Sequence, residues 1–130
     1  MFESMNKQLT DIGVIPVIVI NDAKDALALG QALSDAGMKC AEVTYRTDAA
    51  EETIRIMTEH FPDLLVGAGT VFTKEQVDSA IGAGAKFIDC PIMDTDVVDY
   101  CISKDIPIYP GIATPSEAAQ GVKRGLKILK

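Results

Sequence analysis

The chain has 130 residues, 48% of them hydrophobic, and its 19 acidic residues against 12 basic ones give a net charge of −7. This length favours a single domain, and the apolar content excludes a disordered chain. The acidic balance, with no basic stripe, argues against a nucleic-acid partner, because clustered Lys and Arg carry most of that affinity.

Membrane and metal partners are not expected either. The longest apolar run, residues 14–20, contains Pro16 and is far shorter than the ~20 residues of a bilayer span. The N-terminus lacks the basic start and apolar middle of a secretory signal. Cys40, Cys90 and Cys101 are widely spaced and form no C-x-x-C pair, so neither a disulfide framework nor a zinc site is indicated. We therefore expect a cytoplasmic protein without a metal.

Short β-branched runs alternate with helical patterns from the first apolar run onward. Residues 14–20 precede a predicted helix over 23–36, which Asn21 or Asp22 caps. Residues 40–45 precede a second helix, which opens at 47–48 and ends before Pro62. Each unit reads as one strand followed by one helix.

Three more strand–helix units follow, and their helix starts carry recognisable caps. After the run at 64–70, Thr73 and Gln76 have the spacing of a capping box. After the run at 86–91, residues 94–96 can cap the next helix. After the run at 106–111, Thr114-Pro115-Ser116-Glu117 opens a fifth helix, and a sixth strand is predicted over 126–130.

Alternating strands and helices of this kind indicate an α/β fold with a parallel sheet covered by helices. The six strand starts are separated by 26, 24, 22, 20 and 20 residues. Both an open, flavodoxin-like sheet and a (βα)8 TIM barrel are compatible with this spacing. Periodicity alone does not choose between them.

Polar residues within the strands favour the barrel. Period-two alternation puts Glu42 and Arg46 on one face of the second strand. A sheet covered on both faces has no comfortable place for this pair, whereas the upper interior of a barrel does. Thr70, Pro91 and Lys130 occupy comparable positions at the ends of other strands, so these five residues could face one cavity.

These runs resemble, in order and spacing, the class I aldolases, and specifically the 2-keto-3-deoxy-6-phosphogluconate / 4-hydroxy-2-oxoglutarate aldolase family. The resemblance covers essentially the whole chain. It implies a (βα)8 barrel, usually a homotrimer, that needs no cofactor and cleaves a 2-keto-4-hydroxy acid into pyruvate and an aldehyde. The segments that carry it are Val14–Ile18, Glu42–Arg46, Val66–Thr70, Phe87–Pro91, Tyr109–Glu117 and Gly125–Lys130.

The resemblance also implies a role for each residue of the predicted site. Lys130 corresponds to the Schiff-base lysine, and Glu42 to the carboxylate that moves protons. Arg46 and Thr70 correspond to the groups that hold the substrate carboxylate, and Pro91 to part of the pocket wall. Independently of the resemblance, an Arg fork suits a planar carboxylate, and Glu is a competent general base.

Two features depart from the family pattern. Asp89 stands where an aliphatic residue is typical, and its strand parity points it inward. We expect Asp89 to pair with Lys130 and to oppose its nucleophilicity, since a buried carboxylate needs a partner. The length corresponds to about five and a half βα units, so residues 1–130 are expected to be a single barrel domain truncated on its C-terminal side.

Three functions are therefore compared. The first is a pyruvate-forming aldolase, or the part of one that carries its carboxylate and lysine. The second is an inactive truncated barrel that serves folding or oligomerisation. The third is a flavodoxin-like small-molecule-binding domain, which requires a reversal of strand order within the sheet.

Overall fold

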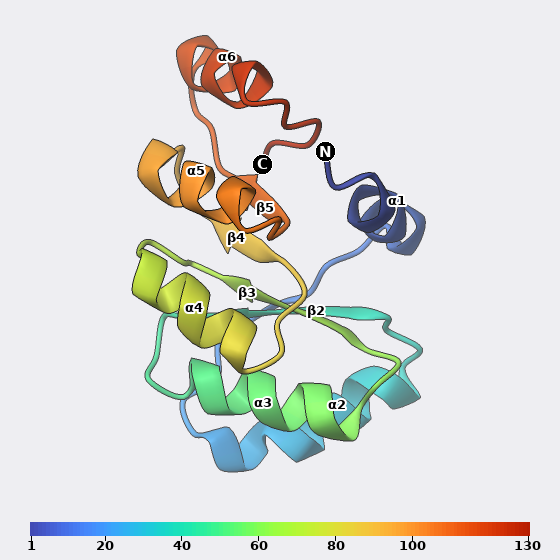
Figure 1. Cartoon of the computed structure of the whole chain (residues 1–130). Coiled ribbons are helices and arrows are strands. Elements are labelled where there is room, and N and C mark those ends of the chain that lie inside the picture. Colours follow the sequence, from blue (N-terminus) through green and yellow to red (C-terminus); the bar gives the residue numbers. More distant parts are fainter.

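The computed structural model describes all 130 residues and contains one five-stranded sheet (Figure 1). All four neighbouring strand pairs are parallel, in the consecutive order β1-β2-β3-β4-β5. This order contains no reversal, so the flavodoxin-like alternative is wrong and the partial (βα) barrel is confirmed. The strands are β1 (Val17–Ile18), β2 (Cys40–Thr44), β3 (Leu65–Gly69), β4 (Ile88–Cys90) and β5 (Ile108–Pro110).

Each strand is followed by a helix, as the sequence predicts (Figure 1). The main hydrophobic core lies between these helices and the sheet, with Ile54, Val66 and Ile88 fully buried in it. No helix is long and apolar enough to cross a membrane. The helices are α2 (Ala26–Asp35), which a 3₁₀ turn η1 (Ala23–Asp25) precedes, α3 (Ala50–His60), α4 (Lys74–Gly82), α5 (Thr95–Ser103) and α6 (Pro115–Lys123).

The predicted caps are present at the starts of three helices. The Gln76 amide donates to Thr73 Oγ1 over 3.2 Å at α4, and the Asp94 carboxylate accepts from two amides at α5. Thr114 and Glu117 form a complete capping box at α6. These short polar side chains satisfy amides that the first helical turn leaves without partners, which is why the local sequence determines these boundaries.

The predicted first and sixth strands differ from the structure. β1 has only two residues, because it is an edge strand and Pro16 has no amide to donate to a ladder. Residues 126–130 form no strand. Two hydrogen bonds alone tie them to the sheet: the Lys130 amide donates to Pro110 O over 3.0 Å, and the Ile112 amide donates to Lys130 O over 2.7 Å.

An N-terminal helix, α1 (Glu3–Ile12), is absent from the sequence-based prediction. Its Leu9 side chain packs with Cys40, Phe87 and Tyr109 in a small second core on the inner side of the sheet. The Tyr109 hydroxyl donates to the side-chain oxygen of Asn6 on α1 over 2.9 Å. The helix thus covers part of the inner face, opposite the side that α2 to α5 cover.

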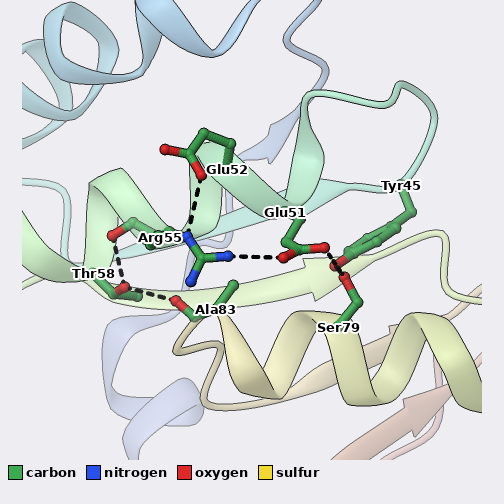
Figure 2. Close-up of polar contacts among 7 residues, drawn as sticks. All are labelled: Tyr45, Glu51, Glu52, Arg55, Thr58, Ser79 and Ala83. Atoms are coloured by element: carbon green, nitrogen blue, oxygen red, sulfur yellow. Dashed lines mark hydrogen bonds and ion pairs between the residues drawn. The ribbon is translucent and has the colours of Figure 1, made fainter.

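A polar network joins the end of β2 to α3 and α4 (Figure 2). The Ser79 hydroxyl donates to Glu51 over 2.7 Å, so the Tyr45 hydroxyl, 2.8 Å away, donates to Ser79. Arg55 donates to the other Glu51 oxygen over 2.8 Å. Tyr45 follows β2 directly, so this network fixes the backbone beside the carboxyl ends of the strands.

Candidate active site

Two buried carboxyl groups lie on the inner side of the sheet. Glu42 is in the middle of β2 with 4% of its surface exposed, and Asp89 is in the middle of β4 with 6% exposed. Burial of a carboxylate costs several kcal/mol unless a partner or a proton compensates it. Each of these two carboxyl groups therefore needs a nearby cation or a bound proton that offsets the cost of its burial.

The position of Glu42 depends on the neighbouring strand. A β-carbon added at Gly69 of β3 would lie 1.8 Å from Glu42 Oε1. Only glycine leaves room there for the carboxyl group, so Gly69 belongs to the site although it has no side chain. The signal for it in the sequence is the Gly67-Ala68-Gly69 run at the end of the third strand.

Asp89 has a cationic partner. Its Oδ1 lies 2.5 Å from Lys130 Nζ, and the lysine side chain is half exposed. Asp89 pairs with Tyr109 in the β4–β5 ladder, and the Lys130 backbone is hydrogen-bonded to the end of β5. The lysine can therefore reach across the end of β5 to β4, and the expected pairing of Asp89 with Lys130 is confirmed.

The carboxyl groups and cations of this cluster influence one another. Burial and, after it, the neighbouring Asp89 carboxylate raise the pKa of Glu42, whereas the Lys130 and Arg46 charges lower it, and the net result is a pKa of about 7. Burial also raises the pKa of Asp89, and the contact with Lys130 counteracts this. A carboxyl group with a pKa near neutrality both accepts and returns protons efficiently.

The other predicted site residues follow the carboxyl ends of β2, β3 and β4. Arg46 is exposed, and its charge acts on Glu42 without a direct ion pair. Thr70 is half-buried and has a left-handed backbone with φ of 56°, which is strained for a β-branched residue. Pro91 is half-buried, and its carbonyl approaches Gly111 so closely that a β-carbon there would lie 2.2 Å from it.

A cavity of about 400 Å³ opens beside the Asp89–Lys130 pair. It lies on the inner side of the sheet, and Leu9 of α1, Phe87 and Tyr109 line its apolar part. Of the predicted site residues, only Lys130 lines it, and the other four lie outside its lining. The Asp89 carboxyl and the Lys130 amine are thus accessible to a small molecule from this cavity.

The residues present offer no metal site, since no group of three His, Cys, Asp or Glu side chains is suitably placed to hold an ion. The ionisable groups gathered here are the Lys130 amine and the Glu42 and Asp89 carboxyls. An amine can attack a carbonyl carbon, and a carboxyl with a pKa near neutrality can move the protons that this attack requires.

Consecutive parallel βα units define the class of (βα)-barrel proteins, and this chain carries two buried carboxyls and a lysine on the inner side of that sheet. Residues 5–130 match the family model described as KDPG and KHG aldolase. The chain belongs to this aldolase family.

Named relatives agree with this assignment. The chain is 38% identical over 130 residues to the 2-dehydro-3-deoxy-phosphogluconate aldolase of Treponema pallidum, across 100% of this chain and 60% of that protein. It is 37% identical over 122 residues to the KHG/KDPG aldolase of Escherichia coli K12, across 94% of this chain and 57% of that protein. The chain therefore spans about 60% of the length of these curated relatives.

A solved structure with a bound reactant is also similar. KDPG aldolase from Legionella pneumophila, with pyruvate captured at low pH as a covalent carbinolamine intermediate, superimposes with a TM-score of 0.81 at 40% identity. The match covers 85% of this chain and 54% of that one. The likeness thus extends to a protein in which a covalent pyruvate adduct was observed.

Proposed function

We propose that this site carries out class I aldolase chemistry, in which Lys130 forms a Schiff base with a 2-keto acid. The reaction is the reversible cleavage of a 2-keto-4-hydroxy acid, either 2-keto-3-deoxy-6-phosphogluconate or 4-hydroxy-2-oxoglutarate, into pyruvate and an aldehyde. The observation that carries the proposal is the cluster of Lys130 with two buried carboxyls beside an open cavity. Family membership supports the same chemistry.

Lys130 is the proposed nucleophile. Its amine attacks the keto carbon, and loss of water leaves an iminium that withdraws electrons from the adjacent carbons. The bond between C3 and C4 of the keto acid then breaks once a base removes the proton of the C4 hydroxyl. The iminium supplies the electron withdrawal, so the proposed reaction needs no cofactor.

Glu42 is the proposed base. Its pKa of about 7 leaves a substantial carboxylate fraction at neutral pH and makes return of the proton easy. Gly69 supports this role, because the Glu42 carboxyl group packs directly against its α-carbon, where any larger residue would displace it.

Arg46, Thr70 and Pro91 are the proposed substrate-binding residues. Arg46 offers a bidentate fork for the keto-acid carboxylate, and the Thr70 hydroxyl adds a donor. The left-handed backbone at Thr70 supports this role, since strained conformations cluster at functional sites. Pro91 is proposed as part of the pocket wall, and its carbonyl packs closely against Gly111, which follows β5.

Borohydride trapping tests the proposal. The chain is incubated with pyruvate and sodium borohydride, and the intact mass is measured for the wild type, Lys130→Arg and Lys127→Arg. A reduced adduct is expected in the wild type and in Lys127→Arg, and none in Lys130→Arg. Lys127 is the matched control, because it is a nearby lysine in an exposed ion pair with Glu3.

The inactive assembly module is the second candidate, and absence of any adduct in the wild type would support it. In either case we propose a homo-oligomer, a trimer, and a cytoplasmic location. Support for assembly comes from Val14, Val17 and Val19, which lie on and beside the edge strand β1 and are each at least 50% exposed. Sedimentation equilibrium tests the trimer, and fractionation of the source cell tests the location.

A further inference from the structure

The Asp89–Lys130 contact has consequences that neither residue has alone. Oδ1 and Nζ are 2.5 Å apart, Asp89 is 6% exposed, and no other cation forms an ion pair with Asp89. A buried carboxylate without a partner is strongly unfavourable, and this contact offsets part of that cost for Asp89. The same contact favours whichever form of Nζ is positively charged.

We propose that Asp89 is the counter-ion of Lys130 in both cationic states of the reaction, the free ammonium and the iminium formed with a 2-keto acid. The iminium half of this inference rests on the proposed function. The ammonium half rests on the geometry of the Asp89–Lys130 contact alone. Asp89 is thus a positioning residue that controls when Lys130 is nucleophilic.

The balance of the proposed step shows why one counter-ion serves both states. An ammonium and a ketone give an iminium and one water: the carbon–nitrogen bond forms, the carbonyl oxygen leaves as water, and two protons from nitrogen leave with it. One positive charge stays at Nζ on both sides of this balance. Only the neutral amine and the carbinolamine between them lack the charge, so Asp89 disfavours these intermediates relative to the two cationic states.

The charged groups around Asp89 are few. Glu42 approaches from β2, and its pKa is raised in part by Asp89. Tyr109 of β5 donates its hydroxyl to Asn6, and burial raises its pKa to about 12, so it stays neutral. On β3, the inner positions are Gly67 and Gly69, which carry no charge. Cys90 follows Asp89 in the chain, and burial raises the pKa of its thiol, so it stays neutral. Lys130 is the one cation in contact.

Competitive labelling with trace acetic anhydride tests the ammonium half of the proposal, because this reagent acylates only free amines. The full chain is labelled across a pH series as wild type and as Asp89→Asn, which keeps the shape and removes the charge. Fragment masses of the C-terminal peptide separate Lys130 from Lys127, which serves as an internal control. Asp89→Val is a second variant of similar volume, and thermal melting checks that both variants fold.

In Asp89→Asn, Lys130 is expected to label severalfold faster than in the wild type near neutral pH, since removing the opposite charge 2.5 Å from Nζ leaves its ammonium form less favoured. The two rates should converge above about pH 10.4, where lysines are ordinarily neutral. Lys127 should label equally in both proteins. Equal Lys130 rates at every pH would overturn the proposal, as would a faster rate that persists at high pH, which reports exposure rather than charge.

Pyruvate trapping across the same pH series tests the iminium half. The pH of maximal trapping should move downward in Asp89→Asn, because both cationic forms lose the nearby negative charge that stabilises them. An unmoved maximum would overturn this half. A wild type that traps no pyruvate, while Lys130 labelling still responds to Asp89, would overturn the proposed function and the iminium role together and would leave the ammonium pairing established.

Discussion

The carboxyl group of Glu42 occupies the space where a β-carbon of Gly69 would be, with Oε1 only 1.8 Å from that position. A glycine on β3 thus determines where the carboxyl on β2 lies. The relationship is specific to this pair, because Gly67, two residues earlier, faces the Phe87 ring instead.

Gly69→Ala is expected to displace Glu42 and to impair its action as a base. The measurement is exchange of the pyruvate methyl protons in D₂O, followed by NMR, which reports base action without requiring the aldehyde. We expect at least about a tenfold loss of the exchange rate, because small misplacements of a catalytic group are costly. Gly67→Ala is the control: it overpacks against Phe87 and costs about 1–3 kcal/mol of stability without contacting Glu42. Equal loss of exchange at equal stability in the two variants would refute the specific role of Gly69.

Glu42→Gln should remove a pH dependence of stability. Burial raises the pKa of Glu42 from 4.5 to about 7, so the folded state binds this proton more tightly than the unfolded state. The resulting stabilisation is complete below pH 4.5 and is lost as pH rises to about 7. Gln is neutral throughout, so the stability of the variant relative to wild type should increase over this range, by a total on the order of 1–3 kcal/mol. Urea unfolding at several pH values measures it, and a constant difference would contradict the buried environment of Glu42.

Leu9→Ala tests whether α1 is part of the folded core. Leu9 is 7% exposed and packs against Cys40, Phe87 and Tyr109, so its truncation should cost about 2–3 kcal/mol. Gln8→Ala, one residue earlier on the exposed side of the same helix, should change stability by less than about 0.5 kcal/mol. Chemical denaturation compares the two. Equal effects would mean that α1 does not pack on the inner face.

The network of Tyr45, Ser79 and Glu51 should be cooperative (Figure 2). Ser79→Ala removes one donor and leaves the half-buried Tyr45 hydroxyl without its acceptor, so we expect a loss of about 1 kcal/mol. Once Tyr45→Phe has removed that hydroxyl, Ser79→Ala should cost less. A double-mutant cycle measures this coupling, and strictly additive effects would show that the hydroxyl pair contributes nothing to stability.

The sequence predicts most of the fold because the residues that determine helix starts and strands lie within or beside those elements. Thr73, Asp94 and the Thr114–Glu117 pair cap helices within a few residues of themselves, and β-branched runs identify the strands. Met5, Leu9 and Ile12 have helical spacing, but the sequence does not predict α1. This helix is stabilised by packing of Leu9 against Phe87 and Tyr109, which lie far along the chain. The repeating apolar runs predict a sixth strand, yet a strand requires a ladder, and residues 126–130 have only two hydrogen bonds to Pro110 and Ile112 at the end of β5.

Side-chain chemistry at the site was predictable to a similar extent. Strand parity alone indicates that Glu42 and Asp89 face inward, and both are buried. The exclusion of Glu42, Arg46, Thr70 and Pro91 from the cavity lining was not predictable, because it depends on where α1 and residues 128–130 lie. The role of Gly69 was not predictable either, because the Gly67-Ala68-Gly69 run does not show that the Glu42 carboxyl fills the space beside Gly69.

The most direct test of the central claim is to locate the borohydride-reduced pyruvate adduct by peptide fragmentation of the wild-type chain. The adduct is expected on Lys130 and on no other lysine, with its yield abolished in Lys130→Arg and retained in Lys127→Arg. An adduct on a different lysine, or none under conditions where the protein is folded, would contradict the assignment of Lys130 as the Schiff-base residue.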